Sequence, residues 1–251
     1  MKTIQKVIQK VALSQNDADM VQRQSMLSGI LKKLFELYCR ILFSVYCPLK
    51  IIGQQNFPTT SFILCSNHCS HLDSGALMIA SGLSFKKCSM IAAKEYFFDN
   101  KIRRVFLNLL MNLIPIDRRI KHNELIQCLA ACKRFVDKGG RTIIFYPEGT
   151  RSLSGEIQTL KHGPALFATE LQLPIVPAYI KGTYEAWPKG KIFMKPKKIY
   201  AIIGDPIYPT QCANHNGSIS KKKIYNEVSK ELEKRIHELR ECHLNGRYPS
   251  C

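Results

Sequence analysis

The sequence predicts an α/β protein, a single domain in which a mixed and mostly buried β-sheet is flanked by helices. Short apolar runs alternate along the chain with stretches of helical spacing, which is typical of a sheet covered by helices. A length of 251 residues fits one large domain better than two small ones, and such a domain buries enough apolar surface to need no disulfide or metal. The ten cysteines are scattered without a C-x-x-C pair, which indicates reduced, packed thiols in a reducing compartment.

The first 50 residues are predicted to form a tail and a helix that precede the main domain, residues 51–251. Residues 1–24 are polar and predict a loosely attached tail. From Ile30 to Ile52 apolar residues are frequent, but charges and a proline interrupt every stretch that approaches the roughly 20 apolar residues of a membrane-spanning helix. This pattern predicts an amphipathic helix that ends before Pro48 and lies in a membrane interface, with an ordinary core-packing helix as an equal alternative.

The remaining elements follow in order along the chain. Six apolar runs predict strands, most of them buried: Ser61–Ser66, Cys88–Ala93, Leu113–Asp117, Thr142–Tyr146, Ile175–Lys181 and Ile199–Gly204. Four segments are predicted to be helical: Asp73–Ala80, a stretch that ends at Met111, a stretch from about Asn123 to the glycine pair Gly139–Gly140, and Ser220–Glu241. The last helix carries one apolar stripe and has Ser220 as its predicted N-cap, so we expect it to pack on the domain.

Positive charge dominates the chain: 37 lysines and arginines stand against 19 acidic residues, a net charge of +18. Such an excess attracts anionic partners, which include nucleic acids, anionic membranes and phosphorylated small molecules. The basic residues are spread along the chain and are not interleaved with aromatic residues as in nucleic-acid-binding modules. Nucleic-acid binding is therefore kept only as a remote alternative, which predicts binding that weakens steeply with salt.

His68 and Asp73 belong to a polar cluster that directly follows an apolar strand, where α/β proteins place their sites. If His68 closes the loop and Asp73 opens the next helix, the carboxylate can reach one ring nitrogen and leave the other free as a base. No G-x-S-x-G nucleophile stands at this turn, so a base that acts on a substrate hydroxyl fits best. Two alternatives stay open: a helix cap, and a metal site with Cys65, Cys69 and His71, whose spacing matches no standard zinc module.

A second polar cluster, FYPEGTRS, follows the strand that ends at Tyr146. Gly149 permits a tight turn, and the main-chain N–H groups of such a turn can bind an anion. Glu148, Thr150 and Arg151 are the polar side chains of this turn. Taken alone, the segment is equally typical of a solvated turn.

Basic side chains stand at two further places where they could meet a phosphate group. Arg118 and Arg119 follow the apolar run LIPID, and an arginine fork suits phosphate oxygens. Lys161 stands shortly before Gly163 in the segment LKHG. Each of these residues also fits an ordinary solvated loop.

Together and in this order, NHCSHLD, IPIDRR, FYPEGTRS and LPIVPAYI resemble the four sequence blocks of the glycerolipid acyltransferases. This family includes the PlsC-type 1-acyl-sn-glycerol-3-phosphate acyltransferases. The resemblance covers roughly residues 51–207, and the H-x4-D and PEGTRS blocks are specific in combination. The second block departs from the family pattern, which often has a glycine before the apolar run where this chain has MNLIPIDR.

The resemblance implies roles for individual residues. His68 matches the family's general base and Asp73 its orienting partner, which would make residues 51–251 the catalytic domain. Pro177 matches the proline of the fourth block. The positions that match substrate-binding residues of the family are Arg118, Glu148, Gly149, Thr150, Arg151 and Lys161.

The resemblance also implies a reaction of phospholipid biosynthesis. A fatty acyl group would move from acyl-CoA or acyl carrier protein to the sn-2 hydroxyl of lysophosphatidic acid, giving phosphatidic acid. No metal and no cofactor besides the acyl donor is expected, and the enzyme is expected at an anionic membrane, on its cytoplasmic face. Another lysophospholipid or a lyso-aminolipid as acceptor is the close alternative, and an inactive lipid-binding relative is disfavoured by the intact motif residues.

Overall fold

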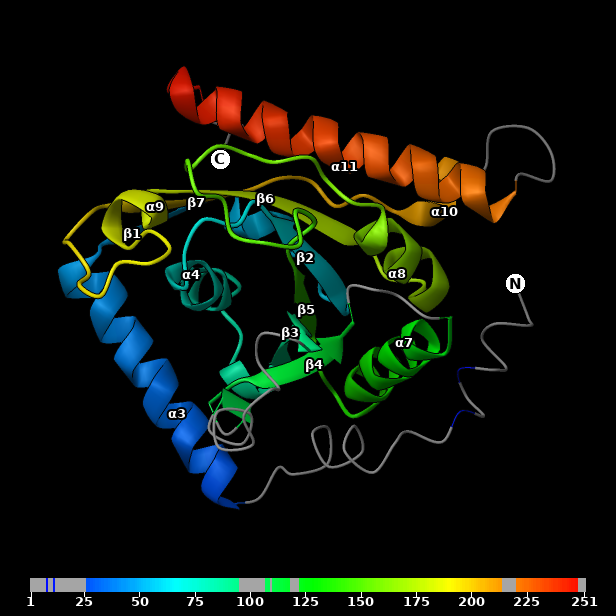
Figure 1. The fold of residues 1–251 in the computed structure, drawn as a ribbon, viewed down its shortest axis with the longest axis horizontal. Helices are drawn as coiled ribbons and strands as arrows, with labels where there is room; N and C mark the ends of the chain where they lie inside the picture. Colours follow the sequence, from blue (N-terminus) through cyan, green and yellow to red (C-terminus); the bar gives the residue numbers. More distant parts are fainter. Residues whose placement is uncertain are drawn as a thin grey trace. The chain divides into compact units, whose positions relative to one another are not determined.

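A computed structural model describes residues 8, 11, 26–94, 107–108, 110–117, 122–213 and 220–247 (Figure 1). The chain divides into two compact units, which are described one at a time. The first unit comprises Met1–Leu37 and Leu83–Ile143, and the second comprises Tyr38–Gly82 and Ile144–Cys251.

The second unit is built on strands in the order β1-β7-β6-β2; β5 follows β2 in the sheet, with its first two residues in the first unit and its last two in the second. Their bounds are β1 Leu49–Ile52, β2 Phe62–Ser66, β5 Thr142–Phe145, β6 Ile175–Lys181 and β7 Ile199–Ile203. β1 pairs with β7 and β2 with β6 in parallel, whereas β6 and β7 are antiparallel. Every residue of β2 and β5 is buried, which explains why these strands are continuous apolar runs rather than alternating ones.

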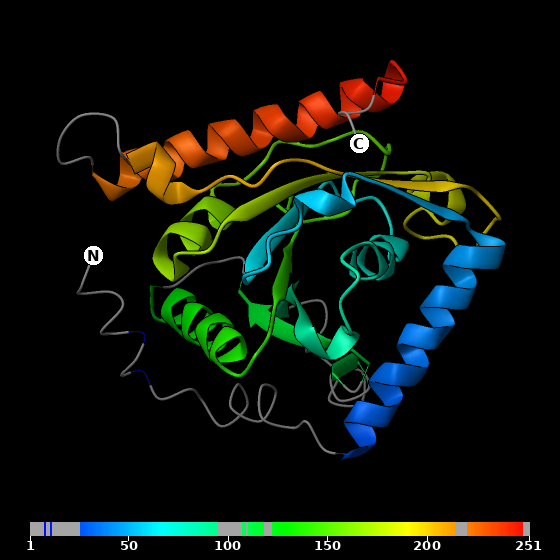
Figure 2. The ribbon, with the colours of Figure 1, turned by 180° about the vertical axis from the view of Figure 1, so that it is seen from behind.

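Helices cover both sides of these strands. α11 (Lys221–Leu244) runs along β6 and β7, while α4 (Leu72–Ala80) lies on the opposite side, as both ribbon views show (Figures 1 and 2). α11 buries Val228, Leu232, Ile236 and Leu239, which are four members of its predicted stripe. Three shorter helices complete the unit: α8 (Gly163–Leu171), α9 (Thr183–Ala186) and α10 (Pro209–Ala213).

The first unit contains a parallel pair of strands, β3 (Cys88–Ala93) and β4 (Asn112–Ile116). Helix α7 (His122–Asp137) packs against β4. The amide of Asn112 donates to the carbonyl of Cys88 at 2.8 Å and so ties the start of β4 to the start of β3.

Helix α3 (Met26–Ile41) continues as a π-helical turn, Leu42–Tyr46, and its sequence spans the division between the two units. One side of it is buried through Cys39, Leu42 and Phe43. The opposite side exposes large apolar residues: Leu27, Ile30, Leu34, Leu37, Tyr38 and Ile41. Within the ranges that the structure covers, no helix is both long and apolar enough to cross a membrane.

The predicted α/β class with a mixed, mostly buried sheet is confirmed, as are the six predicted strands to within two residues at either end. β1 and α8 were not predicted. Ser220 is the N-cap of α11 as expected, but its side chain makes no capping hydrogen bond. The tail at 1–24 and the helical stretch before Met111 lie largely outside the described residues, and the domain boundary at residue 50 stays a prediction.

Candidate active site

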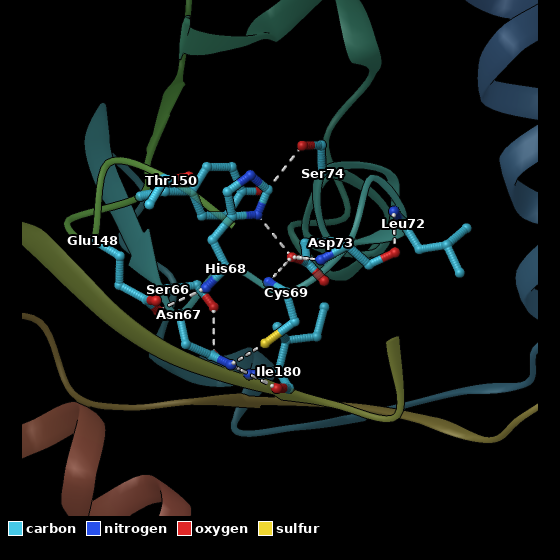
Figure 3. A network of polar contacts seen from close by, with 12 residues as sticks. Ser66, Asn67, His68, Cys69, Leu72, Asp73, Ser74, Glu148, Thr150 and Ile180 are labelled. Atoms are coloured by element: carbon cyan, nitrogen blue, oxygen red, sulfur yellow. Dashed lines mark hydrogen bonds and ion pairs between the residues drawn. The ribbon is translucent and has the colours of Figure 1, made fainter. Parts of the chain in front are cut away.

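The loop that follows β2 is fixed by Asn67. Its buried amide donates to the carbonyl of Ile180 at 3.0 Å and accepts from the N–H of the same residue at 2.8 Å. The side chain thus continues the pairing of β2 with β6 by one more step and makes the next residue, His68, leave the sheet at a defined point (Figure 3).

His68 and Asp73 face one another across this loop, as predicted (Figure 3). The distance between His68 Nδ1 and Asp73 Oδ2 is 2.8 Å, with the imidazole 17% exposed and the carboxylate fully buried. The same Oδ2 accepts the main-chain N–H groups of Cys69 and Ser70 at 2.7 and 2.8 Å. Asp73, in the first turn of α4, therefore closes the loop that precedes the helix and also holds the ring, whereas the N-cap residue of α4, His71, makes no side-chain capping hydrogen bond.

The ring of Tyr146 stacks on the imidazole of His68. The two ring centroids are 3.7 Å apart and the planes differ by 9°. The tyrosine is buried, and its hydroxyl lies 2.9 Å from the hydroxyl of Ser74 on α4. His68 is therefore held at its edge by Asp73 and on its face by Tyr146, which leaves few orientations for the ring.

Glu148 supports the same histidine from the main chain. Its Oε1 accepts the N–H of His68 at 2.9 Å, and its Oε2 accepts the amide of Gln158 at 3.0 Å. Burial raises the pKa of Glu148 to about 7, although the N–H groups of His68 and Gln158 act in the opposite direction. The N–H of Ser152 also donates to the carbonyl of His68 at 2.7 Å, so both peptide groups of His68 are bound by the PEGTRS turn.

In the PEGTRS turn, the side chain of Lys161 lies next to Gly149. Gly149 has φ of 73°, a conformation that glycine adopts without strain, and a Cβ built there would lie 3.0 Å from Lys161 Nζ. Lys161 is exposed, and its N–H donates to the carbonyl of Pro147 at 2.9 Å. Thr150 is exposed, with its carbonyl accepting the amide of Gln158 at 3.4 Å.

The structure thus brings His68, Asp73, Glu148, Gly149, Thr150 and Lys161 together at one end of β2 and β5. Arg151 stands in the same turn, and its charge acts on His71. Arg118 and Arg119 lie outside the described residues.

His71 stands three residues after His68 in the same segment, and the geometry separates the two histidines. Asp73 Oδ2 contacts His68, whereas the His71 ring lies 6.0 Å, centroid to centroid, from that of Trp187. Partial burial and then the positive charge of Arg151 lower the pKa of His71 to about 4. A base that weak transfers protons poorly near neutral pH.

The metal interpretation finds no geometric support. Cys65 and Cys69 are both buried, and burial raises the pKa of both thiols. In the described parts of the chain, no group of three or more histidine, cysteine or acidic side chains is placed to hold a metal ion.

Sequence reasoning missed the supporting roles of Asn67, Tyr146 and Gln158. An asparagine directly before the histidine and an aromatic residue directly before PEG were visible in the motifs. Gln158 stands ten residues after its partner Glu148, and nothing in the sequence pattern marks it.

An acyltransferase family model matches residues 48–181, just over half of the chain. A chloroplastic 1-acyl-sn-glycerol-3-phosphate acyltransferase of Brassica napus is 30% identical over 176 residues, which cover 69% of this chain and 49% of that protein. The 1-acyl-sn-glycerol-3-phosphate acyltransferase of Bacillus subtilis is 26% identical over 201 residues, covering 80% of this chain and 92% of that protein. This chain spans about half the length of the plant relatives that it matches.

The crystal structure of the 1-acyl-sn-glycerophosphate acyltransferase PlsC from Thermotoga maritima has a similar fold. It superposes with a TM-score of 0.62 over 94% of this chain and 93% of that chain, at 22% identity. The family match spans both the loop with His68 and Asp73 and the turn with Glu148, which confirms the resemblance seen in the motifs. On this evidence, the chain belongs to the acyltransferase family.

Proposed function

We propose that this protein transfers a fatty acyl group from a thioester donor to the sn-2 hydroxyl of lysophosphatidic acid, giving phosphatidic acid. The observation that carries the proposal is the 2.8 Å contact between His68 Nδ1 and the fully buried Asp73, in a member of the acyltransferase family. The relatives that are named for this activity support lysophosphatidic acid as the acceptor.

In the proposed mechanism His68 is the general base. Because Nδ1 faces Asp73, Nε2 takes the proton of the acceptor hydroxyl while the hydroxyl oxygen attacks the thioester carbonyl carbon. The carbon–sulfur bond breaks, and the thiolate leaves with the proton that His68 carried. Asp73 stabilises the imidazolium between these two steps. A positioned base contributes roughly 10²- to 10⁴-fold in rate, so positioning of the two substrates must supply much of the rest.

The acceptor phosphate is proposed to bind at the PEGTRS turn. Lys161 Nζ lies over Gly149, and Arg151 in the same turn is the second candidate cation. Glu148 would support this site by accepting the main-chain N–H of His68 and so fixing the position of that residue. Arg118 stays a predicted phosphate ligand from the resemblance alone.

The acyl donor is proposed to be acyl-CoA or acyl carrier protein, with no other cofactor. Every proton and electron pair in the transfer is accounted for by the hydroxyl, the thioester and His68. The reaction therefore needs no redox group, no metal is part of the proposal, and the donor is consumed as a substrate.

The proposed location is an anionic membrane surface on its cytoplasmic side. Helix α3 exposes Leu34, Leu37 and Ile41 along one side, as expected for a helix that lies in a membrane interface. The cysteines within the described ranges are free thiols, in keeping with a reducing compartment. A net charge of +18 would favour a surface that carries anionic lipids.

The test is acyl transfer from radiolabelled acyl-CoA, and separately from acyl carrier protein, to a panel of acceptors. We expect product with lysophosphatidic acid and little with monoacylglycerol, which has the same hydroxyl without the phosphate. Equal rates with both acceptors would contradict phosphate recognition. Product only with another lysophospholipid or with a lyso-aminolipid would show that this other lipid is the acceptor.

A further inference from the structure

Residues 188–198, here called the 188–198 loop, carry the two most exposed large apolar side chains of the described chain. Ile192 is 82% exposed and Phe193 is 84% exposed. The loop connects α9 to β7. Because adjacent, fully exposed isoleucine and phenylalanine side chains are unfavourable in water, this pair suggests a contact with an apolar partner.

All charged residues of the 188–198 loop are lysines. Lys189, Lys191, Lys195, Lys197 and Lys198 are all exposed. No aspartate or glutamate occurs between Glu185 and Asp205 in the sequence. Apolar side chains surrounded by lysines match an anionic bilayer, which offers acyl chains beneath negatively charged head groups.

The loop has a defined conformation rather than being a simple extended linker. The N–H of Lys195 donates to the carbonyl of Ala186 at 2.8 Å, and the indole of Trp187 donates to the carbonyl of Lys191 at 2.8 Å. Gly190 provides the turn, with φ of 89°. These bonds close the loop at its base and leave the lysines and the apolar pair outside.

Two further contacts tie the 188–198 loop to its surroundings. The hydroxyl of Tyr46, at the end of the π-helical turn, donates to the carbonyl of Met194 at 2.8 Å, and the neighbouring Val45 is 77% exposed. On the other side, the hydroxyl of Ser70 donates to the carbonyl of Trp187 at 2.7 Å. The loop is therefore next to the end of the helix that began at α3 in both ribbon views (Figures 1 and 2), and Trp187, directly before the loop, is bonded to the loop that holds His68.

We propose that the 188–198 loop is a membrane-binding element that inserts Ile192 and Phe193 into an anionic bilayer. Its lysines contact the lipid head groups, and Val45 lies on the same membrane-facing surface. This inference rests on the proposed function, since the lipid acceptor would enter from that bilayer. Through the Ser70–Trp187 bond, insertion of the loop would set the position of the His68 loop relative to the lipid surface.

The test uses the full chain and vesicles of phosphatidylcholine with or without phosphatidylglycerol. Trp187 is the only tryptophan of the chain and is bonded to the loop, so its fluorescence reports binding there. The variants are Ile192→Ser with Phe193→Ser, and separately Lys189→Gln with Lys191→Gln and Lys195→Gln. Leu244→Ser, which removes an exposed leucine at the end of α11, is the matched control.

For the apolar double variant we expect the vesicle partition coefficient to fall at least about tenfold, because two large side chains lose their burial in lipid. For the lysine variant we expect a fall of about a hundredfold at low salt, only with phosphatidylglycerol present. Leu244→Ser should bind like the wild type. Unchanged partitioning of both loop variants would overturn the proposal. The loop would then have another partner, such as an acidic protein or a second copy of the chain.

A measurement on the wild type guards against a folding defect in the variants. Lipids brominated in their acyl chains should quench Trp187 in bound protein, and absence of quenching would also overturn the proposal. These readouts need no catalysis, so they are distinguishable from a failure of the proposed function. Loss of vesicle binding with normal transfer to a dispersed short-chain acceptor would support the loop as a membrane element and leave the reaction intact.

Discussion

At the scale of single residues, Tyr146 shows how the site limits the freedom of His68. Its ring covers one face of the imidazole, and its hydroxyl is bonded to Ser74. We predict that Tyr146→Phe keeps most of the turnover, since the stack remains. Tyr146→Leu should lower kcat about 10- to 100-fold with little change in KM, because a misaligned base costs rate rather than binding.

The control for Tyr146 is Ser74→Ala, which removes the same hydroxyl contact and keeps the stack. It should cost about 1 kcal/mol of stability and little activity. Equal kcat values for Tyr146→Leu and Tyr146→Phe would show that the stack does not position His68. Steady-state kinetics with lysophosphatidic acid, next to unfolding curves, provide both readouts.

Glu148 predicts a specific pH dependence of stability. Its pKa is raised from 4.5 to about 7, mainly by burial, so the folded protein holds a proton that the unfolded chain releases. The stabilisation is therefore complete below about pH 4.5 and is lost as the pH rises through about 7. Glu148→Gln cannot lose a proton, and we expect the wild type to lose stability relative to this variant across that window.

Urea unfolding of both proteins at several pH values between about 4 and 8 measures this difference. Circular dichroism of the native states checks that the glutamine variant keeps the fold. Parallel stability curves for the two proteins would contradict a raised pKa at Glu148.

The choice between His68 and His71 lay beyond the sequence. Both histidines stand within five residues of Asp73, and the motif alone names His68 only by resemblance. The deciding facts are three-dimensional: Asp73 Oδ2 is shared by His68 and two main-chain N–H groups, and His71 lies near Arg151 and Trp187. Such sharing depends on the loop path, which spacing does not specify.

At the scale of elements, Asn67 joins β2 to β6 where the strands give way to the site. We predict that Asn67→Ala lowers the free energy of unfolding by about 2–5 kcal/mol, because both main-chain groups of Ile180 lose their partner in a buried place. The matched control is Asn56→Ala, which removes one part-buried bond to the carbonyl of Ile203. A smaller cost for Asn67→Ala than for Asn56→Ala in urea unfolding would refute this role.

Strands and helices were predicted best where their sequence pattern was long and clearly separated from its neighbours. β2 and β5 are uninterrupted apolar runs before polar motifs, and they were located to within a residue. β1 is four residues long and directly continues an apolar segment whose pattern predicts a helix. The sequence therefore did not indicate where the strand begins. α8 begins with Gly163 and Pro164, a pair that suggests a loop, although proline in a first turn is also a helix-start signal.

The directions of the strands were not encoded locally. The sequence predicted a mixed sheet, yet nothing in the runs of β6 and β7 indicates that they pair antiparallel while β1 and β7 pair in parallel. Strand direction depends on the path of the connections, and here α9 and the 188–198 loop together return the chain from β6 into the antiparallel β7.

At the scale of the whole molecule, the motifs predicted most of the described site, because two of the blocks directly follow strands β2 and β5. They named His68, Asp73, Glu148 and Gly149, which the structure gathers together. They did not name the residues that hold these in place, since packing partners such as Tyr146 and Gln158 carry no chemistry of their own. The net positive charge alone did not indicate where an anionic partner would bind, whereas the structure shows five exposed lysines in the 188–198 loop.

His68, oriented by Asp73, is proposed to be the base of an acyl transfer. The most direct test measures product formation from labelled acyl-CoA and lysophosphatidic acid by the wild type, His68→Ala and His71→Ala. We predict a loss of at least about 100-fold for His68→Ala and less than about tenfold for His71→Ala. Unchanged activity of His68→Ala, or a larger loss for His71→Ala, would show that His68 is not the base.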